Sequence, residues 1–163
     1  MKRGRSGSAV IEVAMWMPIL FLLIVGMLQF GKLTYLDYVL NKIVYNAARN
    51  LATSQNVNFC DSADTVTAAA ISGAINDPAT GAPLISNLTA DMLVVSTECL
   101  DTNGVIGTCN TGGCQGLPGA QRPDFVTIAI PGGYSVPLRI PYINLDPILL
   151  RPSATAPFGG SQL

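Results

Sequence analysis

The chain has 163 residues, a length that accommodates one modest domain together with a membrane-spanning segment. Charged residues make up only 12% of it and the net charge is −1, so the sequence provides no basic surface for binding nucleic acid. There is no histidine, which removes the commonest general base and the usual metal ligand. The acidic residues are scattered singly, without a nucleophile motif or a glycine-rich phosphate loop. We therefore expect a non-enzymatic protein without a cofactor or a metal.

The N-terminus combines a short basic leader with a carboxylate at the head of a long uncharged run. Glu12 follows Gly7 by five residues, and the residues 13–30 after it carry no charge. A carboxylate in lipid costs several kcal/mol unless it is neutralised, reaches the surface or finds a partner. Cleavage after Gly7 would free an α-amine on Ser8 as that partner. The spacing is typical of type IV pilin-like precursors.

The uncharged run predicts a transmembrane helix over about 13–30. Its 18 residues would span about 27 Å, close to the roughly 30 Å hydrocarbon core of a bilayer. A secretory signal peptide has a shorter apolar core and a small-residue cleavage site after it, which this run lacks. The N-terminus is expected in the cytoplasm because of the basic residues before the span, namely Lys2, Arg3 and Arg5.

Two residues of this segment have open interpretations. Glu12 either pairs with the amine of Ser8, on the same or a neighbouring subunit, and sets the register between helices, or lies at the membrane surface and needs no partner. Pro18 removes a backbone hydrogen bond and predicts a kink in the helix, either as a harmless bend or as a functional hinge.

The helix is expected to continue beyond the membrane. No proline or glycine interrupts the sequence between Lys32 and Ser54. We therefore predict a helical unit over 8–54, with an amphipathic part over 33–52. Its apolar stripe has the three- and four-residue spacing of one helix face, at Leu33, Leu36, Leu40, Ile43, Val44, Ala47 and Leu51.

Residues 5–52 resemble the TadE-like family of minor pseudopilins, which belong to the tight-adherence (Tad, or Flp pilus) secretion system. The segment 46–52 resembles the small-residue and arginine part of the family helix, and Gln29 departs from it where relatives often have an acidic residue. The features that carry the resemblance are Gly7, Val10, Glu12, Ala14, Pro18, Gly26, Phe30, Gly31 and Lys32.

The resemblance implies a function in pilus assembly. Residues 1–7 would be a cytoplasmic leader removed by a prepilin-type peptidase between Gly7 and Ser8, and Glu12 would be the processing and assembly carboxylate. The expected partners are other minor pseudopilins, pilus assembly proteins and the lipid bilayer of the bacterial inner membrane, and the expected outcomes are cell adhesion and biofilm formation. The resemblance also implies that this chain is not the bulk shaft subunit, because that subunit is far shorter in Flp pili. The alternative is an uncleaved single-span accessory or anchor protein of the envelope.

Residues 55–163 predict a small extracytoplasmic domain, periplasmic or displayed on the pilus. A helix over 64–75 follows a capping sequence, and strands are expected at 92–97 and 124–130. The turn after the second strand predicts a hairpin with 134–140, and a last edge strand is expected at 153–156. The expected fold class is α+β and pilin-like: a long N-terminal transmembrane helix that extends into a domain with a short antiparallel sheet.

The cysteines all follow the membrane segment, on the side where disulfides form. Three pairings are possible, and we favour Cys109 with Cys114 and Cys60 with Cys99, which would pin a glycine-rich loop over 98–123. A zinc site built from all of them is the alternative, although the spacings lack a paired zinc-ligand motif. The loop is either a surface excursion or a binding segment; a calcium site at Asp101 and Asn103 would lack the acidic closing ligand.

Overall fold

The computed structural model of the protein describes residues 6–55, 57–59, 64–109, 122–137, 139–140, 143–144 and 146–159, with the backbone alone at 6–9, 139–140 and 143–144. The helical elements are α1 (Ser6–Thr53), α2 (Thr65–Ile75) and the short 3₁₀ turn η1 (Ala90–Met92). The strands are β1 (Val94–Leu100), β2 (Ile106–Thr108), β3 (Phe125–Ala129), β4 (Tyr134–Val136), β5 (Arg139–Ile140), β6 (Ile143–Asn144), β7 (Ile148–Leu150) and β8 (Ser153–Pro157).

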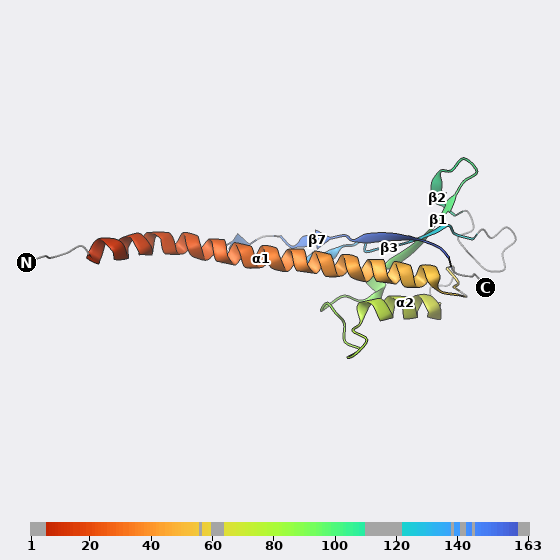
Figure 1. Cartoon of the computed structure of the whole chain (residues 1–163), viewed down its shortest axis with the longest axis horizontal. Helices are drawn as coiled ribbons and strands as arrows, with labels where there is room; N and C mark the ends of the chain where they lie inside the picture. Colours follow the sequence, from red (N-terminus) through yellow and green to blue (C-terminus); the bar gives the residue numbers. More distant parts are fainter. Residues whose placement is uncertain are drawn as a thin grey trace, which may run out of the picture.

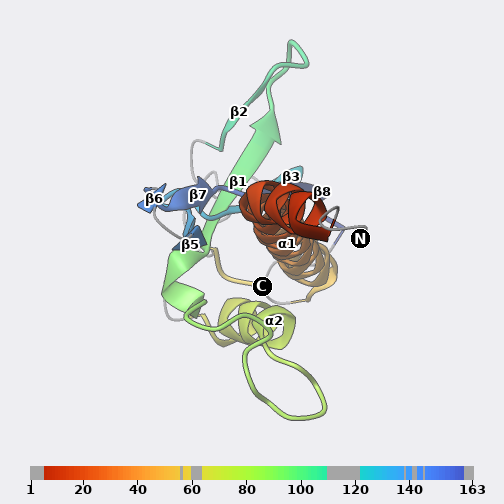
Figure 2. The ribbon, with the colours of Figure 1, turned by 90° about the vertical axis from the view of Figure 1, so that its left-hand side faces the viewer.

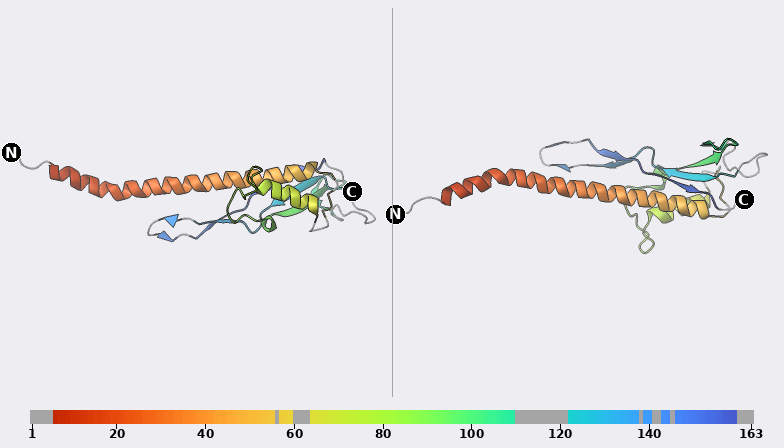
Figure 3. Two further views of the ribbon diagram at one scale, coloured as in Figure 1. Left: turned by 90° about the horizontal axis from the view of Figure 1, so that it is seen from below. Right: turned by 45° about the horizontal axis from the view of Figure 1, so that its top comes forward.

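One long helix dominates the molecule. α1 has 48 residues and therefore extends for about 72 Å. Its N-terminal part projects alone, while the other elements gather around its C-terminal part (Figure 1). The chain thus has the predicted α+β architecture, an apolar N-terminal helix followed by a small antiparallel sheet domain. α1 continues through Pro18 without a break, and its axis bends within the red N-terminal part (Figure 3).

The C-terminal part of α1 is covered by a sheet and by α2. The main sheet is antiparallel with the order β2-β1-β3-β8, and α1 lies against β3 and β8 on one side and against α2 on another (Figure 2). The predicted apolar stripe of α1 is confirmed, because Leu33 and Leu36 are half-buried and the rest of the stripe is buried. From the other elements the core receives chiefly Ile71, Ala74, Ile75, Val126, Ile128, Ile130, Val136, Ala156 and Phe158.

The predicted second helix forms with the expected cap. The carboxylate of Asp64 accepts hydrogen bonds from the backbone N–H of Thr67 at 2.8 Å and from its hydroxyl at 2.9 Å. These bonds satisfy an N–H group that the first turn of a helix leaves without a partner. The helix therefore begins at Thr65, one residue after the predicted start, and ends at Ile75 as predicted.

The predicted hairpin of the strands 124–130 and 134–140 is wrong. The first strand forms as β3, but its two edges are taken by β1 and β8, so none is left for β4. The turn at Pro131 carries the chain away from the main sheet instead, with Gly133 at φ +74 and its N–H donating to the carbonyl of Ile130 at 3.0 Å. β4 then pairs with β7.

A long antiparallel ribbon replaces that hairpin. Its strand pairs follow one another as β3 with β8, β4 with β7 and β5 with β6. We call the last pair, β5 and β6, the ribbon tip. The base of the ribbon belongs to the main sheet, whereas the tip runs back beside α1 toward the N-terminal end of the helix (Figure 3). The predicted last strand is confirmed as β8, which lies at the edge of the main sheet.

Candidate membrane and assembly segment

The N-terminal half of α1 has the length and composition of a membrane span. Its most apolar window of 18 residues has a mean hydropathy of 2.3, and none of that window is buried against the rest of the described chain. Large apolar side chains point outward around this part of the helix, so no single face is reserved for a protein core. The exposed residues include Val13, Met15, Trp16, Ile19, Leu20, Phe21, Leu23, Ile24, Met27, Leu28 and Phe30.

Gly7, Ser8 and Glu12 all lie in the first turns of α1, which begins at Ser6. Ser8 and Glu12 are four residues apart, so they lie on the same face of the helix about one turn from each other. Glutamate side chains in a helix lean toward its N-terminus, and this places the carboxylate on the side where an amine on Ser8 would be. The side chain of Glu12 is exposed, and within the described ranges nothing is paired with it.

The cysteines pair differently from the prediction. Cys99 at the end of β1 is bonded to Cys109, with a Cα–Cα distance of 4.9 Å. The favoured pairings of Cys60 with Cys99 and of Cys109 with Cys114 are therefore wrong, and Cys60 and Cys114 lie outside the described residues. The zinc site made from all of these cysteines is excluded too, because two of the thiolates it needs are joined to each other.

The disulfide closes a β-hairpin rather than a glycine-rich loop. Residues 98–100 belong to β1 and 106–108 to β2, with Cys99 opposite Gly107 in the register. The turn between them is closed by hydrogen bonds from the N–H of Asp101 to the carbonyl of Val105 at 2.9 Å and from the N–H of Gly104 to the carbonyl of Asp101 at 2.8 Å. The remaining loop residues 110–121 lie outside the described residues.

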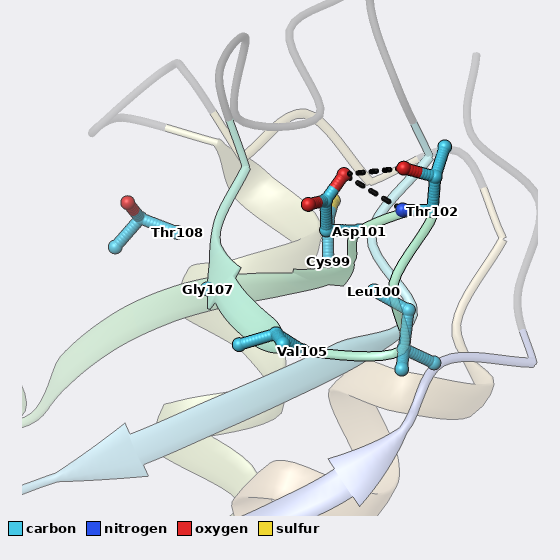
Figure 4. Close-up of a pocket in the computed structure, with 7 residues that line it drawn as sticks. All are labelled: Cys99, Leu100, Asp101, Thr102, Val105, Gly107 and Thr108. Carbon is cyan, nitrogen blue, oxygen red and sulfur yellow. Dashed lines mark hydrogen bonds between the residues drawn. The ribbon is translucent and has the colours of Figure 1, made fainter.

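The calcium interpretation of this turn finds no support in the structure. One carboxylate oxygen of Asp101 accepts from the backbone N–H and the hydroxyl of Thr102, at 2.7 and 3.2 Å (Figure 4). The other oxygen accepts from the side-chain amide of Asn103 at 3.3 Å. The carboxylate thus stabilises the local turn. In the part of the chain that the structure describes, no group of three or more acidic or cysteine side chains could hold a metal ion.

The ribbon tip is the feature that sequence reasoning missed. Its strands are only two residues long, and Pro137, Pro141 and Pro147 interrupt the pattern around them. Prolines of this kind argue against a regular strand, so the periodicity gave no signal. The high apolar content of 138–150 was the remaining hint that this segment lies against something other than water.

Comparison with known proteins identifies the N-terminal segment. The family model described as TadE-like protein matches residues 7–49, which lie entirely within α1. Among curated proteins and solved structures, no match to the chain was found. The resemblance seen in the sequence is confirmed over the matched residues. The match and the apolar helix are consistent with a membrane-anchored protein associated with a Tad pilus. The TadE-like family itself is typically structural and is associated with pilus components.

Proposed function

We propose that the protein is a non-enzymatic, pilin-like minor subunit that supports initiation or assembly of a Tad-type pilus and thereby adhesion. The observation that carries this proposal is the exposed apolar half of α1, which has Gly7 and Glu12 in its first turns and is matched by the TadE-like family model over 7–49. Among the described residues, most of the side chains on this half of the helix are not covered by the rest of the chain, so lipid or other subunits must cover them.

The leader sets the orientation and is then removed. The three basic residues before Gly7 hold the N-terminus in the cytoplasm, and the domain beyond Lys32 faces the periplasm or the cell exterior. Hydrolysis of the bond between Gly7 and Ser8 by a prepilin-type peptidase leaves six basic and ten acidic residues, a net charge of −4. It also creates the α-amine of Ser8 one turn from the carboxylate of Glu12.

The new amine gives Glu12 a partner in the membrane. Within one chain the pair neutralises the carboxylate, and between two chains it fixes how far one helix is shifted along its neighbour. Other minor pseudopilins and pilus assembly proteins are the partners that this register would serve. Pro18, between this pair and the middle of the span, is a position where the helix can bend without leaving the membrane.

Mass spectrometry of the membrane-extracted protein tests the proposal. In cells that contain a prepilin-type peptidase, we expect a mature chain beginning at Ser8. Gly7→Leu should keep residues 1–7, because a bulky side chain replaces the glycine beside the cleaved bond. Gly4→Leu, a matched change inside the leader, should be processed normally.

An intact Met1 in the wild-type protein, or normal processing of Gly7→Leu, contradicts the proposed cleavage. Either result favours the alternative, an uncleaved single-span accessory or anchor protein of the envelope. That alternative keeps the membrane helix and the outward domain but has no use for the spacing between Gly7 and Glu12.

A further inference from the structure

The ribbon tip lies beside the part of α1 that leaves the membrane. β5 is in contact with α1, although the sheet and α2 cover the helix only nearer its C-terminal end (Figure 1). In Figure 3 the tip extends beside the helix well beyond the main sheet, toward the N-terminus of the chain. The chain therefore sends a β-structure back along its own helix in the direction of the bilayer.

The burial of α1 shows how far this covering reaches. Val25 and Gln29 are half-buried, whereas Val10 and Val13 near the start of the helix are 69% and 62% exposed. Val25, Gln29 and Leu33 follow at four-residue steps, so they continue the core-facing stripe toward the N-terminus on one helix face. One face of α1 is therefore half-buried from Val25 onward, within the uncharged run 13–30.

The position of Val25 sets the depth of the covering. Val25 precedes Lys32, the first charge after the run, by seven residues, or about 10 Å along the helix. If the lipid ended at Val25, only residues 13–24 would cross the hydrocarbon core, and their length of about 18 Å is too short for roughly 30 Å. The outer boundary of the hydrocarbon core must therefore lie between Val25 and Lys32, close to the level at which the tip lies.

The sequence of the tip suits the boundary between lipid headgroups and acyl chains. No charged residue occurs between Arg139 at the start of β5 and Asp146 after β6. An open strand edge is not tolerated in the hydrocarbon core, because its N–H and C=O groups would lack partners there. The headgroup boundary accepts such an edge, and the guanidinium of an arginine is a good ligand for lipid phosphate.

We propose that the ribbon tip is a second membrane contact, seated in the headgroup boundary of the outer leaflet beside the exit of α1. This inference rests on the membrane anchoring and the outward domain of the proposed function. Its occupant is a phospholipid surface. A domain held by both the helix and the tip keeps a defined height and orientation over the bilayer, which a single helix alone does not impose.

Tryptophan fluorescence tests the contact, because Trp16 is the only tryptophan of the chain. Ile143→Trp is made in a Trp16→Phe background, and the full chain is reconstituted into phosphatidylcholine vesicles with bromines either near the headgroup end or near the middle of the acyl chains. Bromine quenches tryptophan on contact. We expect loss of emission from position 143, larger with the bromines near the headgroup.

Two controls separate the contact from the anchoring. Val105→Trp in the same background puts the probe in the turn of the β1–β2 hairpin, at the far end of the domain, and should not be quenched (Figure 1). Wild-type Trp16, within the run 13–30, should be quenched whether or not the tip meets lipid. Retention of the disulfide between Cys99 and Cys109 reports correct folding of each variant, and Ile140→Trp replaces Ile143→Trp if that variant fails to fold.

Quenching of Trp16 without quenching at position 143 overturns the inference and leaves the anchoring intact. A shift of the emission at position 143 to shorter wavelength, without quenching, also overturns it, because the tip is then covered by protein such as a second subunit. If Trp16 itself is not quenched, the anchoring in the proposed function fails, and the inference fails with it.

Discussion

The two halves of α1 share one backbone and differ in what surrounds them. In the N-terminal half, Leu22 is one of many outward-facing apolar residues and is 48% exposed; in the C-terminal half, Leu40 is fully buried. No break in the helix separates them, since α1 is continuous from Ser6 to Thr53. The helix therefore forms equally well in both surroundings, whereas the pattern of its side chains differs between them.

The first half is apolar on all sides, as is typical of a helix surrounded by lipid or by other subunits. The second half is amphipathic because one face meets the core and the other meets water. The polar face of the second half carries Thr34, Asp37, Asn41, Lys42, Asn46 and Arg49, all of them exposed. Matched substitutions in the two halves test this difference.

The largest effect is expected from shortening a leucine in the covered half. Leu40→Ala should lower the free energy of unfolding by about 2–5 kcal/mol, because it leaves a cavity between α1 and its covering elements. The matched change Leu22→Ala removes the same atoms from an exposed position and should leave the domain unchanged. Thermal unfolding of the full chain in detergent micelles, followed by circular dichroism, measures both. Equal destabilisation by the two variants would contradict the division of the helix.

An added charge should have its larger effect in the N-terminal half, whereas the loss of a leucine side chain has its larger effect in the C-terminal half. Leu22→Arg places a guanidinium near the middle of the run 13–30, which disfavours insertion by about 3 kcal/mol. Tyr38→Arg adds the same charge at a side chain that is 65% exposed in the outer half, where water solvates it. The measurement is the fraction of each variant that stays in carbonate-washed membranes. Full retention of Leu22→Arg would mean that this half of α1 is not in lipid.

The smallest effect concerns a single charge at the head of the helix. Glu12→Gln keeps the size of the side chain but removes the negative charge, and we expect association with partner pseudopilins to weaken by about tenfold, the value of one charge-assisted hydrogen bond. Asp37→Asn makes the matched change in the outer half and should have no effect. Co-purification of the partners from solubilised membranes measures both. Unchanged recovery with Glu12→Gln would refute the register role of this residue.

Local signals in the sequence predicted the helical part of the fold well. The stripe from Leu33 to Leu51 was visible as three- and four-residue spacing, and the structure buries it as expected. Asp64 was recognised as part of a capping sequence, and its carboxylate forms the cap. The strand around Val126 and Ile128 was equally clear, because alternation along a strand needs no knowledge of its neighbours.

The predictions were wrong where a segment could pair with more than one distant segment. β4 follows β3 after a glycine turn, as in a hairpin, yet both edges of β3 are occupied by β1 and β8. Cys99 is bonded to Cys109 because the register between β1 and β2 brings these cysteines close together. Cys99 lies opposite Gly107, and Gly107 precedes Cys109 by two residues. Neither choice is encoded in local spacing, since both depend on which strands compete for an edge.

Local sequence patterns alone predict the uncharged run 13–30, the position of Glu12 after Gly7, the amphipathic stripe and the cap of the second helix. These depend on residues within a few turns of one another, where chain geometry leaves little choice. The strand order, the pairing of Cys99 and the return of the ribbon tip along α1 are apparent only in the folded chain. Those features depend on long-range packing, in which the core and the available strand edges select one arrangement among several with similar local preferences.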